Sequence, residues 1–170
     1  MDAINLMEEG KKIYQEGEYL QAAQLFEQAA QAFEQAGKIL EAAEARNNQS
    51  VALLMGEEAE AALRAVEGTP QLFAQQGDTE REAMAWGNQA AALEALGRLE
   101  EAIQAYRTAA ERFEALGKSD LRAEMEKAIA AIRLKQGRFM DAGMEMISTL
   151  QRPNLPWWQR LLRTLLRIRV

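Results

Sequence analysis

The chain has 170 residues, of which 48% are hydrophobic, and its 26 acidic and 20 basic side chains give a net charge of −6. The absence of cysteine and histidine excludes disulfides, thiolate zinc sites and imidazole-based catalysis. The acidic balance argues against nucleic-acid binding. With neither a signal-like start nor an apolar run of about 20 residues, we expect a cytoplasmic protein that needs no metal or cofactor.

Apolar residues recur three and four positions apart between glycines, and this pattern predicts an all-α chain of eight helices. Gly17, Gly97 and Gly137 are expected to end the first helix of a pair. Gly56 stands one position early and predicts a slightly longer turn. The expected helices cover residues 2–16, 19–36, 39–55, 58–76, 79–96, 99–116, 119–136 and 139–151.

The helix expected over 58–76 is interrupted by Thr69 and Pro70. Proline lacks the N–H that an interior helical position donates, which costs about 3 kcal/mol. We therefore expect a kink near Gly68, and we interpret it as a defect tolerated at the surface.

The helix pairs repeat every 40 residues, with repeats at about 1–37, 38–77, 78–117 and 118–151. A small residue at the start of each second helix lets the two helices of a pair approach closely, and a large residue four positions later fills the space beside the contact. One pair cannot bury both faces of its helices, so each pair is expected to stack on the next. The residues that coincide are Ala22, Ala62, Ala102 and Ala142, then Phe33, Phe73 and Phe113.

The repeat resembles the tetratricopeptide (TPR) family in a longer form of about 40 residues, whose signature is W-x2-L-G-x2-Y followed by A-x3-F. The third repeat reads W-x2-Q-A-x2-L from Trp86 and A-x3-Y from Ala102. The first reads L-x2-E-G-x2-I from Leu6 and A-x3-F from Ala22. The resemblance covers residues 1–151 and implies a right-handed superhelical solenoid of antiparallel helix pairs. Such proteins are non-catalytic scaffolds whose first helices line a concave groove that binds a peptide or a helix.

The resemblance also implies which residues line the groove. Asn48 and Asn88 match the asparagine that bonds the ligand backbone in peptide-binding relatives, because an amide both donates and accepts; alternatively, they satisfy neighbouring helices. The few cations are opposed by acids such as Glu124, so the groove suits a bulky basic helix better than a carboxylate. The predicted lining is Glu44, Asn47, Asn48, Val51, Met84, Asn88, Ala91, Glu94, Lys127 and Lys135.

Residues 152–170 differ in composition from the rest of the chain. Five arginines and no acid follow Glu145, whereas the first 145 residues hold 15 basic and 26 acidic side chains, a net charge of −11. Prolines at 153 and 156 favour a new helix over 157–169, with one apolar half and one arginine arc. Its predicted docking residues are Trp157, Trp158, Arg160, Leu161, Leu162, Arg163, Leu165, Leu166 and Arg167.

Three surfaces could cover this C-terminal helix. It could cap the last helix pair, lie on an anionic membrane, or enter a groove of its own or of a second copy, which would cause self-association. The sequence offers no nucleophile–base pair and no glycine-rich phosphate loop, so we do not expect an enzyme. The predicted function is a protein-binding scaffold with a protein or peptide ligand; the alternative is a peripheral membrane adaptor anchored by this helix.

Overall fold

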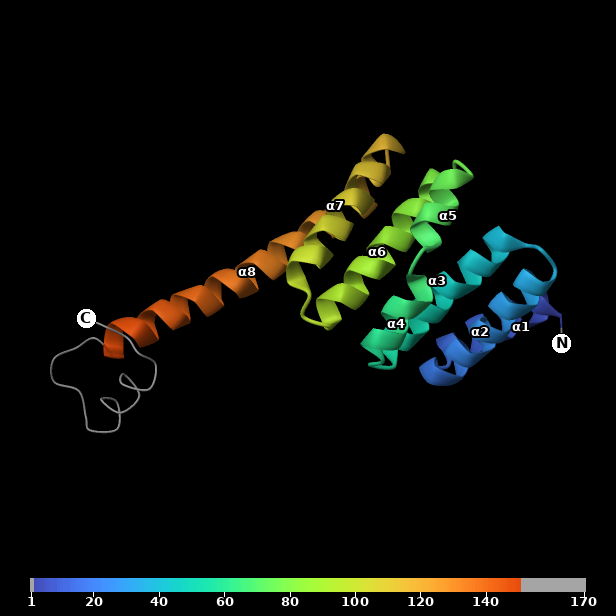
Figure 1. Ribbon diagram of the computed structural model, residues 1–170, viewed down its shortest axis with the longest axis horizontal. Coiled ribbons are helices and arrows are strands. Elements are labelled where there is room, and N and C mark those ends of the chain that lie inside the picture. The colour runs from blue at the N-terminus through green and yellow to red at the C-terminus, as the bar shows by residue number, and fades with distance from the viewer. Residues whose placement is uncertain (1, 151–170) are drawn as a thin grey trace. The chain divides into compact units, whose positions relative to one another are not determined.

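The computed structural model describes residues 2–150, and these residues form helices joined by short turns (Figure 1). Except at one break, the first seven helices begin and end within one residue of the predicted bounds, and the all-α class is confirmed. The helices are α1 (Ala3–Gln15), α2 (Tyr19–Gln35), α3 (Ile39–Met55), α4 (Ala59–Val66), α5 (Thr69–Gln75), α6 (Thr79–Ala95), α7 (Leu99–Ala115) and α8 (Ser119–Leu150).

Residues 2–129 form one compact unit, and the described residues 130–150 belong to a second. Within the first unit the helices pack in sequential antiparallel pairs, so that neighbours in the sequence are neighbours in space. Helix α6 also packs on α3 and α4, which is how one repeat stacks on the next. The predicted right-handed superhelix stays a prediction.

The turns between helix pairs use glycine because the chain must adopt a left-handed backbone there. At the end of α2, Gly37 has φ +72°, and the N–H of Lys38 donates to the Phe33 carbonyl at 2.8 Å. Two repeats later, Gly117 has φ +70°, and the N–H of Lys118 donates to the Phe113 carbonyl at 2.9 Å. These bonds satisfy carbonyls at the helix ends, so each repeat closes in the same way.

The turn after α3 corrects the prediction for Gly56. Glu57 takes the left-handed conformation with φ +64°, and α4 begins four residues after α3 ends, as in the other pairs. The turn is therefore not longer. A Cβ on Gly56 would lie 2.5 Å from Cδ2 of Leu20. Gly56 itself has φ −85°, so the turn does not require glycine there, and the short contact is with the flexible end of an exposed Leu20 side chain that can turn aside.

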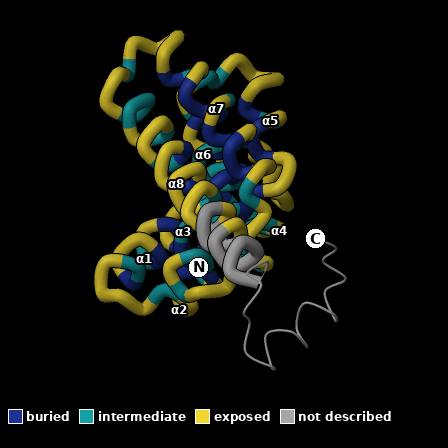
Figure 2. Tube along the Cα trace, turned by 90° about the vertical axis from the view of Figure 1, so that its left-hand side faces the viewer, coloured by how far each residue is buried: buried dark blue, intermediate teal, exposed yellow. Residues whose placement is uncertain are grey.

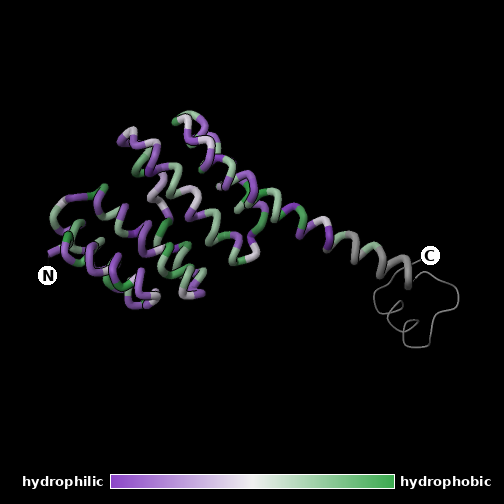
Figure 3. The backbone as a smooth tube through the Cα atoms, turned by 180° about the vertical axis from the view of Figure 1, so that it is seen from behind, coloured by the Kyte–Doolittle hydropathy of each residue, from purple (hydrophilic) through white to green (hydrophobic). Residues whose placement is uncertain are grey.

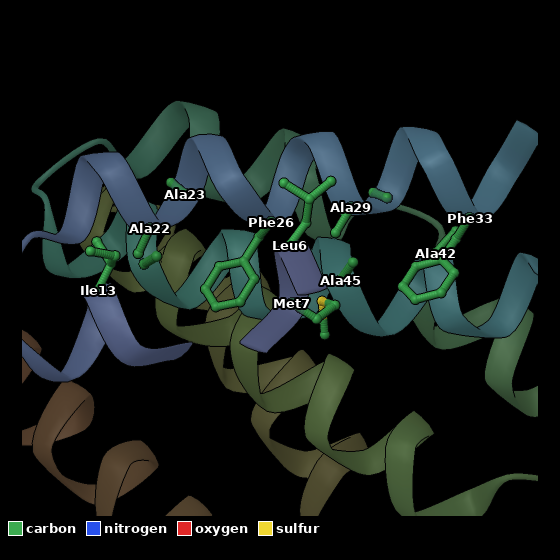
Figure 4. Close-up of a cluster of buried hydrophobic side chains, with 12 residues drawn as sticks. Leu6, Met7, Ile13, Ala22, Ala23, Phe26, Ala29, Phe33, Ala42 and Ala45 are labelled. Atoms are coloured by element: carbon green, nitrogen blue, oxygen red, sulfur yellow. The ribbon is translucent and has the colours of Figure 1, made fainter. Parts of the chain in front are cut away.

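The core of the first unit follows the repeated residues. Ala22, Ala62 and Ala102 are fully buried at the contacts between paired helices. Phe26 and Phe33 point from α2 into the space between α1, α2 and α3 (Figure 4). Buried positions lie on the sides of helices that face each other (Figure 2), and hydrophobic residues are interspersed with hydrophilic ones along the helices of the first unit (Figure 3). In α1, α2 and α7 this spacing is the amphipathic pattern from which the helices were predicted.

The break after Val66 lies near the predicted kink, but the surface interpretation is wrong. Gly68 has φ +80°, and α5 starts anew with Pro70 in its first turn, where proline is favoured. Thr69 is fully buried, and Pro70 is buried too. The Thr69 hydroxyl donates to Oδ1 of Asn47 at 3.0 Å or to the Val66 carbonyl at 2.9 Å. The break is therefore part of the core.

The predicted turn at Gly137 is also wrong. Helix α8 runs through it as one helix of 32 residues, so the sequence from 118 to 151 does not form a helix pair. A hairpin gains stability only if the returning helix has an apolar surface to bury. In the fourth repeat Arg133 stands where Leu93 does, and Gly143 where Ile103 does. The C-terminal helix predicted over 157–169 lies outside the described residues.

Candidate functional site

One face of the first helix of each repeat stays accessible, and we call it the α1–α3–α6 face. Positions 40 residues apart on successive repeats share this face. It consists of Lys11 and Gln15 of α1, Glu44, Asn48 and Val51 of α3, and Met84, Asn88 and Ala91 of α6. The α3 residues are half-buried, and Met84 is 50% exposed. The face therefore combines amide and charged groups with accessible apolar side chains.

A hollow of about 270 Å³ opens at the N-terminal end of this face, and we call it the N-terminal hollow. Its lining comes from three helices. They are α1 (Lys11, Tyr14 and Gln15), α2 (Phe26) and α3 (Asn48 and Val51). Phe26 and Val51 supply apolar surface, while the other groups supply an ammonium, a phenol and two amides. Such a set can bury a side chain and bond a peptide group at once.

Lys11 is held only weakly in its present position. Its Nζ lies 2.9 Å from Oε1 of Glu8, and both side chains are about half exposed or more, at 47% and 67%. An exposed ion pair of this kind contributes about 0–1 kcal/mol. The Lys11 ammonium can therefore exchange this partner for a carbonyl or carboxylate oxygen of a ligand.

The α1 residues of the hollow were not among the predicted lining residues, because that prediction began at the second repeat. The 40-residue step contains the missing signal. Lys11 stands one repeat before Val51 and two before Ala91, and Gln15 stands one repeat before Met55. Applying the step backwards would have placed Lys11 and Gln15 on the face.

The structure does not bring all the predicted groove residues together. Asn48 and Val51 line the N-terminal hollow, and Asn88 and Ala91 are half-buried on the same face of α6. Asn47 is only 7% exposed and accepts a hydrogen bond from Thr69, so its predicted place in the groove is wrong. Lys127 is exposed on the part of α8 in the first unit, and Lys135 belongs to the second unit.

The two predicted groove acids are bound within the protein. Oε2 of Glu44 accepts from Nη1 of Arg81 at 3.1 Å, which links α3 to α6. Arg81 also pairs with Asp78, the N-cap of α6, at 2.6 Å, and its guanidinium lies 5.3 Å from the Phe73 ring. The backbone N–H of Arg81 holds the pKa of Asp78 below its usual value. Glu94 accepts from the Tyr106 hydroxyl at 3.2 Å. Arg81 consequently offsets the charge of Glu44 on this face.

No helix within 2–150 is both long and apolar enough to cross a bilayer. In the same residues no three acidic side chains gather in a way that could hold a metal ion.

The family of the chain follows from its whole repeat region. A model of the family described as SNAP, soluble NSF attachment protein, matches residues 1–149. The chain belongs to the SNAP family. SNAP proteins are TPR-like helical repeat proteins, which confirms the resemblance at that level, and they are non-catalytic adaptors, which confirms that the chain is not an enzyme. No curated protein and no solved structure matches the chain.

Proposed function

We propose that this SNAP-family chain is an adaptor that binds an extended peptide or a helix of a partner protein on its α1–α3–α6 face. The N-terminal hollow carries the proposal, because it places amide, phenol and ammonium groups beside an apolar wall on that face. Its volume of about 270 Å³ is at the lower limit of small-molecule pockets, which span roughly 300–1,000 Å³. A site of this size suits one anchoring side chain of a longer ligand.

The remaining face supports a helical or extended ligand. The Asn48 amide can donate to a ligand carbonyl and accept from a ligand N–H, and Asn88 repeats this group one repeat later. Met55 and Met84, each about half exposed, offer adaptable apolar contacts along α3 and α6. A ligand lying along the face would therefore meet polar anchors at fixed intervals and soft apolar surface between them.

The family suggests the class of partner. SNAP proteins are named for attachment to NSF, and members of the family bind SNARE complexes and NSF. We propose partners of the same kind for this chain, with a helix of a bundle lying on the α1–α3–α6 face.

Binding to a purified SNARE bundle, measured by isothermal titration calorimetry, tests the partner class. Asn48→Ala and Lys11→Ala are expected to weaken binding about tenfold together, because each removes a hydrogen-bonding group from the ligand. Gln31→Ala, an exposed α2 position outside the hollow, is the matched control. If the bundle does not bind, the partner class is wrong.

A selection of random peptides displayed on phage tests the face without assuming a partner. Peptides enriched on the natural chain should bind the Asn48→Ala, Lys11→Ala double variant much more weakly than the Gln31→Ala control. Equal binding to all three proteins would contradict the proposed face.

A second candidate function, peripheral membrane attachment, rests on the sequence of residues 152–170. Four arginines, two tryptophans and no acid from Pro153 onward suit anionic lipid head groups and their interface. Flotation with vesicles containing anionic lipid should carry the full chain but not a Trp157→Ser, Trp158→Ser variant. If neither floats, the cap and groove alternatives remain, and limited proteolysis separates them, because Asn88→Ala should free a groove-bound tail to cleavage but should not free a cap.

A further inference from the structure

Two hollows of the first unit occupy equivalent places in successive repeats. The α3–α4 hollow has a volume of about 470 Å³, and the α6–α7 hollow about 420 Å³. Residues that lie 40 positions apart in the sequence line the two hollows. The matching pairs are Gln49 with Gln89, Leu53 with Leu93, and Ala65 with Ala105. The α3–α4 hollow has a further wall from α2, formed by Glu27, Ala30 and Gln31, and the remaining differences come from the side chains that do not match.

The unmatched side chains give the two hollows opposite charges. Arg46 and Arg64 line the α3–α4 hollow, with Glu27 as the one acid among its lining residues. Glu100 and Glu101 line the α6–α7 hollow, and its lining contains no cation. Of the two equivalent hollows, only the α6–α7 hollow therefore favours a positively charged ligand.

The Gln89 amide gives the α6–α7 hollow a second, independent feature. Its Oε1 is buried without a hydrogen-bond partner, although the side chain lines the hollow. An unsatisfied buried acceptor costs about 1–3 kcal/mol. The terminal torsion of glutamine is broad, so the amide can turn Oε1 toward a donor placed in the hollow. A ligand with N–H groups would relieve this cost.

Trp86 and the acidic rim complete the hollow. Trp86 stands where the α3–α4 hollow has Arg46, and it packs against the core beside Phe113, which leaves an aromatic wall for a cation. Glu101 pairs with Arg98 through Nε at 2.8 Å and Nη2 at 2.7 Å. Both side chains of this pair are about half exposed, so a ligand cation can share the carboxylate at little cost.

We propose that the α6–α7 hollow binds the guanidinium group of an arginine on a basic segment of a partner protein. The planar group stacks on Trp86 and donates to Gln89 and to the Glu100 and Glu101 carboxylates, since guanidinium offers five donors and no acceptor. This site lies on a different side of α6 from Asn88, so it is separate from the α1–α3–α6 face.

Nuclear magnetic resonance on the full chain tests this proposal with the capped peptide acetyl-Ala-Arg-Ala-amide. The peptide should shift the Trp86 indole N–H and the Gln89 side-chain amide, with the indole signal assigned by Trp86→Phe. The same peptide with citrulline in place of arginine keeps the shape without the charge, and should bind at least fivefold more weakly. Equal binding of the arginine and citrulline peptides would overturn the proposal.

Matched variants locate the site. Glu100→Gln with Glu101→Gln should weaken the arginine peptide about fivefold, as expected for two largely exposed charges. Gln89→Met should weaken binding of the arginine peptide more than the double glutamate variant does. Gln49→Met, the equivalent change in the α3–α4 hollow, should leave the binding unchanged. Asn48→Ala should leave it unchanged, which separates this site from the proposed peptide face. Shifts absent from the α6–α7 hollow, or shifts that persist in all variants, would refute the assignment.

Discussion

Gly137 and Gly97 provide a direct test of the long helix α8. The sequence gives them equivalent positions one repeat apart, but Gly97 has φ +73° and follows the end of α6, whereas Gly137 lies inside α8. A Cβ added at either position would meet nothing within 4 Å. The substitutions Gly137→Ala and Gly97→Ala therefore add the same methyl group to open space and differ only in backbone conformation.

The two substitutions should change stability in opposite directions. Alanine in a helix interior is about 0.5–1 kcal/mol more favourable than glycine, so Gly137→Ala should stabilise α8. An L-residue in the left-handed region costs about 1–2 kcal/mol, so Gly97→Ala should destabilise the turn. The difference is about 2 kcal/mol, which corresponds to roughly a 30-fold difference in a local opening equilibrium at 1.4 kcal/mol per factor of ten.

Amide hydrogen exchange measures these local equilibria. Exchange near residue 137 should slow about two- to fivefold in Gly137→Ala, the ratio that 0.5–1 kcal/mol implies. Exchange near residue 97 should accelerate in Gly97→Ala. Ala131→Gly, at an exposed position of α8, is the reciprocal control and should accelerate exchange locally. If Gly137→Ala accelerates exchange as Gly97→Ala does, the chain turns at residue 137 and the reasoning about α8 fails.

Three further predictions concern the first unit and are measured by urea unfolding. Thr69→Val leaves Asn47 without its donor and should cost about 1–3 kcal/mol, whereas Thr69→Ser keeps the bond and should cost less. Burial raises the pKa of Tyr106, so the folded protein favours the neutral phenol. The free energy of unfolding should therefore fall as the pH rises above about 10, and Tyr106→Phe should remove that fall. Asp78→Ala should cost about 1 kcal/mol at neutral pH. Because a backbone hydrogen bond lowers the pKa of Asp78, this difference should shrink as the pH drops below about 4; a constant difference would contradict the capping role.

The sequence determined the helices of the first unit and their repeat. Helix positions depend on the spacing of apolar residues, and turn positions such as Gly37 depend on a backbone conformation that glycine favours. Both are local properties, so they can be read without knowing what lies opposite. The burial of Phe33, Phe73 and Phe113 followed from the same step of 40 residues.

Tertiary structure alone decided which way individual side chains face and whether a helix stops. Asn47 and Asn48 are adjacent, yet about 100° of helical rotation places one against Thr69 and the other in the N-terminal hollow. Gly137 could end a helix as Gly97 does, yet it lies inside α8. A glycine at this position ends a helix only where a returning helix would bury apolar surface. Both outcomes depend on residues distant in the sequence, because burial and hydrogen bonding are fixed by the neighbours that packing supplies.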